Sequence, residues 1–236
     1  MSQDPPMTRV PFFEGDEFEF PVADQATAEG VIAMGGEITV RSLRRAYGLG
    51  FFPWPVDPRY PILWFSPPER CIFELDAVKI SRSLRRELRG ARFEVRFDTA
   101  FDQVLEACAS ARKDGFGTWI DDRMKPGYLA LHKDGRRDCL SAHSIEAWAG
   151  GRLVGGLYGI AVGGVFTGES MFFRETNASK VALVALIERM RERGFDHLDA
   201  QIHNQHLDSL GASVIPREEF QARLTAARYN DCRLTD

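Results

Sequence analysis

Apolar and polar residues alternate most regularly in the second half of the chain. Three strands are predicted there in a row, over SIEAW, GRLVGGLYGIAV and VFTGESMF. Short glycine turns at 149–151 and 163–164 join them. Strands joined by such short turns pair with their neighbours in opposite directions, so we expect an antiparallel meander.

A strong helix is predicted after the meander, over residues 180–193, because apolar residues recur there at helical spacing. Asn177 or Ser179 can cap its first turn. The strand HLDAQIH and the short helix QHLDSLG follow. This order, β-β-β-α-β-α, resembles the core of the GNAT-type acyltransferases.

The middle of the chain mixes helices and strands. RFEVRFD alternates as a strand does, and residues 99–111 have helical spacing with Asp98 as the expected cap. Residues 121–132 are predicted to form one helix or two short ones, because Pro126 is a poor interior residue. The fold class expected is mixed α/β, of the α+β kind.

Prolines divide the chain unevenly, since ten of the twelve lie in the first 70 residues. A segment so rich in proline is typical of a small, irregular domain, and its one clear helix is predicted over residues 39–49. We therefore expect a small N-terminal domain over 1–72 and a GNAT-like catalytic domain over 73–236.

Composition excludes several classes of protein. A hydrophobic fraction of 44% with 27% charged residues is ordinary for a globular protein. No apolar run approaches a membrane span, the first residues have no signal-peptide pattern, and the four cysteines form no CxxC pair. We expect a cytoplasmic protein with buried thiols and no membrane partner.

The basic segment KISRSLRRELRGAR stands out in a chain whose formal net charge is −4. On a helix, its arginines at i, i+3, i+4 and i+7 share one face: Arg82, Arg85, Arg86 and Arg89. A solvated helix face is the ordinary fate of such a charge run. The alternative is a contact with nucleic-acid phosphates.

A single carboxylate, Glu169, interrupts the apolar strand VFTGESMF. Burying a lone charge is costly unless it is paired or faces a cavity. One interpretation is that Gly168 begins a bulge and Glu169 points to solvent. The other is that the carboxylate serves a site.

Longer motifs resemble one family across roughly residues 31–220. The chain is similar to the leucyl/phenylalanyl-tRNA–protein transferases in these blocks: AMGGEITVRSLRRAYGLGFFPW, PILWFSPPER, TWI, AHSIEAW, LVGGLYGIAVGGVFTGESMFFRETNASKVAL and LDAQIHNQHLDSLGASVIPR.

The resemblance implies a function. Members of that family transfer leucine or phenylalanine, and sometimes methionine, from aminoacyl-tRNA to the N-terminal Arg or Lys of a protein. The product is marked for degradation by the N-degron pathway. The resemblance also implies a small N-terminal domain, a GNAT-like C-terminal domain, and neither a metal nor coenzyme A. We expect a monomer.

Three catalytic residues are implied by the resemblance. Asp199 and Gln201 lie two apart on a predicted strand and match the family's Asp-x-Gln, for which a proton relay to the attacking amine is one proposal. The other lets a ribose hydroxyl of the tRNA move the proton, so that both residues only orient substrates. Glu169 matches a residue that helps to hold a substrate amino group.

The remaining site residues follow from the same resemblance, beside the ordinary alternatives of core packing and interdomain wedges. Trp54 and Trp119 match tryptophans that contact the terminal adenosine, with Tyr47 and Tyr128 close by. The arginine face of the basic segment becomes the expected contact for the acceptor stem. The pocket for the transferred side chain would be apolar, formed by Leu157, Phe166, Met171 and Leu198 with Leu183 and Leu186.

Four rival functions differ in the residues that they need. Metal hydrolysis would use His203 and His206, at HxxH spacing but without a third ligand. A Cys–His hydrolase would use Cys108 or Cys139 with His143. An acetyltransferase needs a glycine-rich phosphate loop, whereas the corresponding loop here is FFRETNAS. A non-catalytic tRNA-binding module would keep the arginines and tryptophans but tolerate the loss of the carboxylates.

Overall fold

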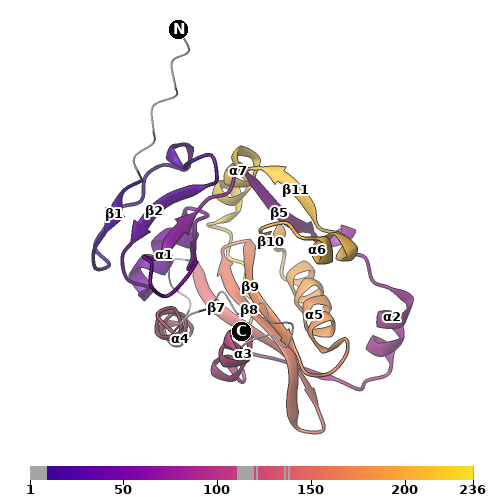
Figure 1. Cartoon of the computed structure of the whole chain (residues 1–236). Coiled ribbons are helices and arrows are strands. Elements are labelled where there is room, and N and C mark those ends of the chain that lie inside the picture. Colours follow the sequence, from indigo (N-terminus) through magenta and orange to yellow (C-terminus); the bar gives the residue numbers. More distant parts are fainter. Residues whose placement is uncertain (1–9, 111–119, 121, 136, 138, 236) are drawn as a thin grey trace.

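The computed structural model describes residues 10–110, 120, 122–135, 137 and 139–235. Two sheets dominate it, one of four strands and one of seven (Figure 1). The predicted mixed α/β class is confirmed. In the described residues, no helix combines the length and the apolar character that crossing a membrane requires.

The small sheet is built from the proline-rich part of the chain. Its strand order is β1-β2-β4-β3, with bounds β1 (Phe12–Phe13), β2 (Val31–Gly35), β3 (Phe52–Trp54) and β4 (Leu63–Phe65). The predicted helix is present as α1 (Val40–Gly48), and Thr39 and Ser42 cap it reciprocally, each side chain bonding to the other's backbone N–H. A short 3-10 turn, η1 (Ala23–Gln25), precedes β2.

The large sheet has the order β11-β5-β10-β9-β8-β7-β6. Its strands are β5 (Glu69–Glu74), β6 (Glu94–Phe97), β7 (Leu140–Ala149), β8 (Arg152–Val162), β9 (Val165–Phe173), β10 (His197–Gln201) and β11 (Ser213–Pro216). The predicted meander is confirmed as β7-β8-β9, and β10 pairs with β9 in parallel.

Helices cover both faces of the large sheet. They are η2 (Leu75–Ala77), α2 (Arg82–Arg89), α3 (Phe101–Ala109), α4 (Lys125–Asp134), α5 (Ala178–Glu192), α6 (Gln205–Leu210) and α7 (Arg217–Ala227). The predicted order β-β-β-α-β-α is therefore present as β7-β8-β9-α5-β10-α6.

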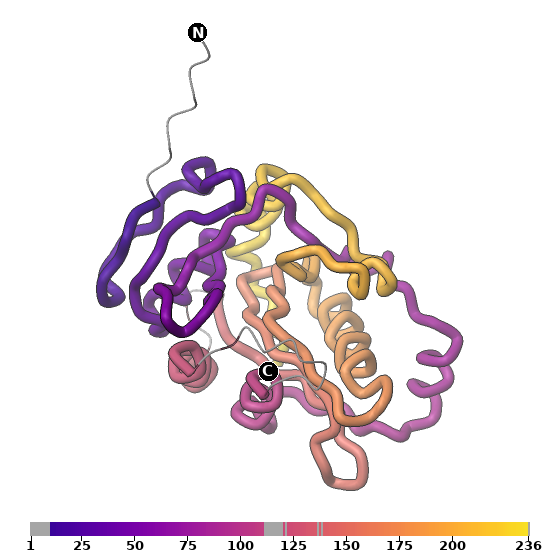
Figure 2. The backbone as a smooth tube through the Cα atoms, viewed as in Figure 1, coloured from indigo at the N-terminus to yellow at the C-terminus, as the bar shows by residue number. Residues whose placement is uncertain are grey.

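Each face of the large sheet packs against its own hydrophobic core cluster. Leu157 packs in the cluster beneath α5, while its neighbour Tyr158 packs in the cluster shared with α1, α3, α4 and the small sheet. Successive residues of a strand point to opposite faces, so the two clusters lie on opposite sides of the sheet. In Figure 2 the C-terminal helix α7 lies beside the small sheet, and Gln221 of α7 donates to the carbonyl of Leu49 at 3.0 Å.

Two predicted helix caps need correction. Asp98 does not cap α3, whose N-cap is Ala100 without a side-chain hydrogen bond, because Asp98 bonds to His143 instead. Asn177 does occupy the N-cap position of α5, but its side chain makes no capping bond. The tail contains β11 and α7, which the sequence pattern did not reveal. The expected boundary between residues 72 and 73 falls inside β5, and the division into domains stays a prediction.

Candidate active site

The parallel strands β9 and β10 separate beside three of the candidate catalytic residues, Glu169, Asp199 and Gln201. Their last paired residues are Thr167 and Asp199. Beyond that pair, the two strands carry Glu169 and Gln201. Gln201 is the last residue of β10, while β9 continues to Phe173. The two polar side chains therefore lie at the place where adjacent parallel strands diverge.

A bulge in β9 re-aims Glu169. Gly159 faces Gly168 and Tyr158 faces Ser170, which leaves Glu169 as the extra, unpaired residue. The bulge suggested by Gly168 is therefore present. The interpretation that Glu169 points to solvent is wrong, because the residue is only 6% exposed.

A second bulge places Gln201. Asp199 faces Ile72 and Gln201 faces Cys71, so Ala200 is the additional residue in β10. Gln201 has φ +61°, in the left-handed region that favours glycine. Its backbone N–H donates to Asp199 Oδ1 at 2.8 Å, and its side-chain Nε2 donates to Glu169 Oε1 at 2.8 Å.

Two tyrosines continue this chain of hydrogen bonds. The hydroxyl of Tyr128 donates to Glu169 Oε2 at 3.0 Å and lies 2.7 Å from the hydroxyl of Tyr47. Gly127 of α4 lets the segment that leads into α1 pack closely against this helix: a Cβ at residue 127 would lie 2.4 Å from the carbonyl oxygen of Ile38. Burial, followed by the charge of Glu169, raises the pKa of both tyrosines well above the usual value, so both remain hydrogen-bond donors.

Arg70 is a residue of this network that the sequence analysis missed. Its guanidinium forms a two-pronged ion pair with Asp199, with Nε 2.8 Å from Oδ1 and Nη2 2.6 Å from Oδ2. The side chains are 2% and 0% exposed. The only sequence signal was an arginine directly before the apolar run CIF, a weaker signal than the carboxylate inside VFTGESMF.

Burial gives Glu169 a proton affinity suited to chemistry near neutral pH. Loss of solvent raises the pKa of Glu169 to about 7, although its hydrogen bonds from tyrosine act in the opposite direction. A carboxyl group with such a pKa exists in both protonation states at neutral pH. It can accept a proton from a substrate and later return it.

The predicted apolar pocket residues gather elsewhere. Leu157, Phe166 and Leu198 are buried in the core cluster beneath α5, and Met171 packs against that cluster. Leu183 and Leu186 of α5 belong to the same cluster. Tyr128 and Tyr47 lie in the other cluster, on the opposite face of the sheet. The structure thus unites the polar residues of the predicted site, while the pocket for the transferred side chain stays a prediction.

The predicted nucleic-acid contacts are spread over the molecule. Trp54, on β3, is half-buried and packs edge-on against Phe52 and Phe65. Trp119 lies outside the described residues. The four arginines of α2 are all exposed, and within the described part of the chain none of them forms an ion pair: Arg82, Arg85, Arg86 and Arg89. Leu84, on the other side of α2, packs against α5.

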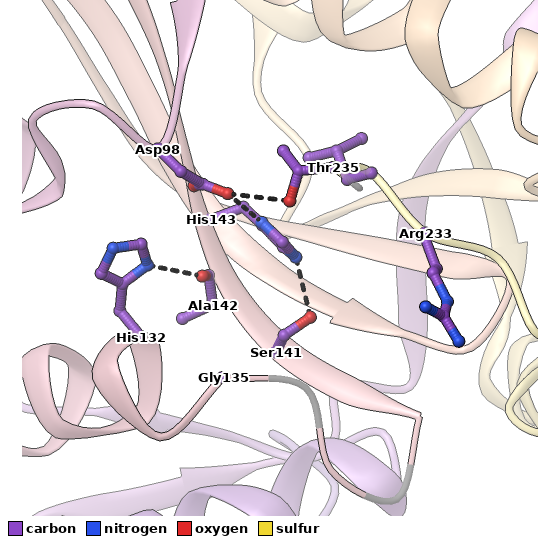
Figure 3. Close-up of a pocket in the computed structure, with 9 residues that line it drawn as sticks. Asp98, His132, Gly135, Ser141, Ala142, His143, Arg233 and Thr235 are labelled. Carbon is purple, nitrogen blue, oxygen red and sulfur yellow. Dashed lines mark hydrogen bonds and ion pairs between the residues drawn. The ribbon is translucent and has the colours of Figure 1, made fainter.

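A separate polar cluster lies on β7 beside the C-terminal segment. Figure 3 shows the imidazole of His143 between Asp98 and Ser141, at 2.6 Å and 2.7 Å. Asp98 also accepts from the backbone N–H of Ser144 at 2.9 Å and the hydroxyl of Thr235 at 3.3 Å. Asp98, Ser141, His143 and Thr235 line a cavity of about 270 Å³, together with His132, Gly135, Ala142, Arg233 and Leu234.

The contacts of His143 and His203 bear on two of the rival functions. Both ring nitrogens of His143 are engaged by Asp98 and Ser141, so His143 forms no Cys–His pair with Cys139 or Cys108. His203 is bonded to Asp208 at 2.7 Å. Among the residues that the structure describes, no three histidine, cysteine or carboxylate side chains gather closely enough to hold a metal ion.

Family models match most of the chain. The model described as leucyl/phenylalanyl-tRNA protein transferase matches residues 72–225, and that for the N-terminal domain of the same protein matches residues 36–68.

Curated relatives match over nearly their whole length. A leucyl/phenylalanyl-tRNA–protein transferase of Nitrosospira multiformis is 46% identical over 217 residues, covering 91% of this chain and 90% of the relative. Relatives of the same name in Azoarcus sp. and Syntrophotalea carbinolica are each 48% identical, covering 89% and 87% of this chain and 87% of each relative.

Solved structures are more distant. The one described as "The structure of L-PGS from Bacillus licheniformis" is 16% identical, has a TM-score of 0.35, and covers 73% of this chain and 53% of that chain. A likeness this weak carries no inference about function.

Proposed function

Because this chain belongs to the leucyl/phenylalanyl-tRNA–protein transferase family, we propose that it moves leucine or phenylalanine, with methionine as a further donor, onto proteins that begin with Arg or Lys. The chain is an aminoacyltransferase that uses aminoacyl-tRNA and a protein acceptor. The product, with a bulky apolar N-terminus, enters the N-degron pathway.

The observation that carries this proposal is the hydrogen-bonded pair Glu169–Gln201 at the point where β9 and β10 separate. The reaction is attack by an α-amine on an aminoacyl ester. Such an ester is already activated, so the site has to orient the amine, accept its proton and stabilise the developing oxyanion. Glu169, Gln201 and Asp199 are the proposed catalytic group, and no cofactor is required.

The negative charge of the Glu169 carboxylate favours a basic acceptor. Glu169 supplies a carboxylate for a cationic N-terminal residue or its amine. For the donor, we propose that the apolar side chain of the aminoacyl group enters between β9 and β10 and meets the cluster beneath α5. An apolar pocket discriminates by about 1–3 kcal/mol per methylene group, which suits a donor range of leucine, phenylalanine and methionine.

The tRNA is proposed to use two surfaces. Trp54 and Trp119 stack with the terminal adenosine, since stacking on an aromatic ring needs no reading of base edges. The exposed arginine face of α2 contacts the phosphates of the acceptor stem. We further propose that the protein is a monomer of two domains and works in the cytoplasm, where aminoacyl-tRNA is available.

The direct test is transfer of radiolabelled leucine from leucyl-tRNA to matched peptides that begin with Arg, Lys or Ala. The proposal expects label on the Arg and Lys peptides and none on the Ala peptide. Binding of leucyl-tRNA without label on any peptide would instead indicate a tRNA-binding module.

A further inference from the structure

Asp199 is fully occupied as a hydrogen-bond acceptor. Its Oδ1 accepts from Arg70 Nε and from the backbone N–H of Gln201, and its Oδ2 accepts from Arg70 Nη2 and from Thr167 Oγ1 at 3.1 Å. A carboxylate offers about four acceptor positions. With all of them used and the side chain 0% exposed, Asp199 has none left for a proton from a substrate amine.

Arg70 is held as firmly as the carboxylate that it binds. The carbon at the centre of its guanidinium lies 4.7 Å from the ring centroid of Phe52 and 4.2 Å from that of Phe220. Phe52 comes from the small sheet and Phe220 from α7, so elements from both ends of the chain clamp the side chain. Arg70 therefore fixes the orientation of Asp199 through a rigid two-pronged contact.

The fixed carboxylate of Asp199 in turn holds the backbone of Gln201. The left-handed conformation at Gln201 is unfavourable for a residue with a side chain, and Asp199 Oδ1 stabilises it by accepting the N–H of that residue. The same conformation aims the side-chain amide of Gln201 at Glu169. Arg70, Asp199, Gln201 and Glu169 thus form one chain in which each residue sets the position of the next.

Glu169, unlike Asp199, has free hydrogen-bond acceptor positions. Gln201 donates to its Oε1 and Tyr128 to its Oε2, and Tyr47 is a third hydrogen-bond donor to the carboxylate. Three donors use fewer than the roughly four acceptor positions of a carboxylate, so Glu169 keeps acceptor capacity. Its pKa of about 7 lies close to that of an α-amine, near 8, so proton transfer between the two groups is nearly balanced.

Resting on the proposed function, we propose that Arg70 is a positioning residue that makes Asp199 a fixed anchor for Gln201, and that Glu169 takes the proton of the attacking amine. The amine nitrogen forms a bond to the ester carbonyl carbon, and its proton passes to the carboxylate of Glu169. The bond between that carbon and the ribose oxygen breaks, and the electron pair goes to the oxygen. Glu169 then returns the proton to the ribose oxygen, and the site is restored.

The test is the pH dependence of kcat/KM for leucine transfer to an Arg peptide, between about pH 5.5 and 8, corrected for ester hydrolysis. Two groups must be deprotonated in wild type, the amine and Glu169. The logarithm of kcat/KM should therefore rise with a slope near 2 below about pH 7. Glu169→Gln should lower the slope to about 1, because only the amine then titrates.

The positioning role predicts a different pattern. Asp199→Asn and Arg70→Lys should lower kcat/KM by about 30- to 300-fold, mainly in kcat, and keep the slope of about 2. Arg223→Lys is the matched control. Arg223 of α7 forms a similar two-pronged ion pair with Glu74, at 2.5 and 3.0 Å, and Glu74 lies on β5, the strand that carries Arg70. That variant should stay within about threefold of wild type.

The pH slopes decide whether Glu169 or Asp199 is the base. A slope of about 1 for Asp199→Asn with a slope of about 2 for Glu169→Gln would overturn the inference and make Asp199 the base. Arg70→Lys with wild-type kcat would overturn the positioning role. If Arg70→Lys does not fold, the decrease in kcat of Asp199→Asn tests the anchor, and the slopes of the two carboxylate variants test the base. A wild-type protein that transfers nothing from any donor would overturn the proposed function itself.

Discussion

The side-chain amide of Gln201 donates a 2.8 Å hydrogen bond to Glu169 across the gap that opens when β9 and β10 stop pairing. Each residue reaches this place through a bulge in its own strand. Bulges are common beside active sites because they redirect a side chain without ending the sheet. The geometry therefore concentrates the proposed chemistry at one point, which the following predictions test.

Glu169 should weaken the fold at alkaline pH. Its folded pKa, about 7, is raised above the unfolded value, so the folded state favours the protonated form and stability falls as pH rises from about 4.5 to 7. At pH 8 this cost is about 3 kcal/mol. Glu169→Gln should therefore be more stable than wild type at pH 8 in urea unfolding, with the difference shrinking towards pH 5.

The control for that experiment is Glu188→Gln, which changes an exposed glutamate on α5. It should leave the free energy of unfolding nearly unchanged at both pH values. A Glu169→Gln variant that is less stable than wild type at pH 8 would contradict the assignment of a costly buried carboxylate.

Tyr128 should contribute to transfer through its hydroxyl. Tyr128→Phe removes the donor to Glu169 Oε2, and loss of one such bond corresponds to roughly a tenfold decrease in kcat/KM. Tyr158→Phe is a matched control, because its ring lies 5.5 Å from that of Tyr128 and its buried hydroxyl has no partner among the described residues. Steady-state transfer assays should show a decrease for Tyr128→Phe alone; equal effects would argue against the role of this bond.

The arginine face of α2 should govern tRNA binding. Arg85→Ala with Arg86→Ala should weaken binding of leucyl-tRNA and reduce the salt dependence of log K by about 1–2, since each lost phosphate contact lowers the slope by about 0.7–0.9. A charge-matched control is Arg137→Ala with Arg152→Ala, whose side chains are 70% and 77% exposed. Filter binding at several salt concentrations would measure both slopes, and identical slopes would remove α2 from the tRNA surface.

Asp98 should contribute to the free energy of unfolding and not to aminoacyl transfer. Burial raises its pKa, but the hydrogen bonds from His143 and from the backbone of Ser144 outweigh burial and lower the pKa below its usual value. Its contribution is therefore present above the unfolded pKa of about 3.9 and lost as pH falls through the lower, folded value.

Asp98→Asn is thus expected to lower the free energy of unfolding at pH 7 by about 1–3 kcal/mol, with a smaller difference below about pH 4. Urea unfolding across this range would measure the effect. Transfer at 25 °C should persist, since Asp98 lies outside the Glu169 network. A folded but inactive Asp98→Asn protein would instead place the His143 cluster in the reaction.

Sequence patterns predicted the meander, α5 and α1 because these elements follow local rules of periodicity and capping. The prediction that Asp199 and Gln201 share a face of one strand did not anticipate the bulge at Ala200. The backbone N–H of Gln201 reaches the carboxylate of Asp199 because Gln201 adopts a left-handed backbone conformation. A bulge depends on pairing with a partner strand, and periodicity within one segment does not reveal it.

The pairing of Arg70 with Asp199 joins residues 129 positions apart, so no local signal identifies it. Glu169 was identifiable as an interruption of an apolar strand, whereas Arg70 follows Glu69 at the start of β5 and interrupts nothing. The error at Asp98 has a similar origin: its carboxylate bonds to His143 on β7, a tertiary partner that outweighs the local capping preference.

The most direct test of the account is single-turnover transfer of leucine to an Arg peptide by Glu169→Ala, measured together with binding of leucyl-tRNA by the same protein. The account predicts a decrease in the transfer rate of more than about 100-fold, with tRNA affinity within about threefold of wild type. A Glu169→Ala protein that transfers leucine at the wild-type rate would show that the reaction takes place without this carboxylate, and would contradict the assignment of the site.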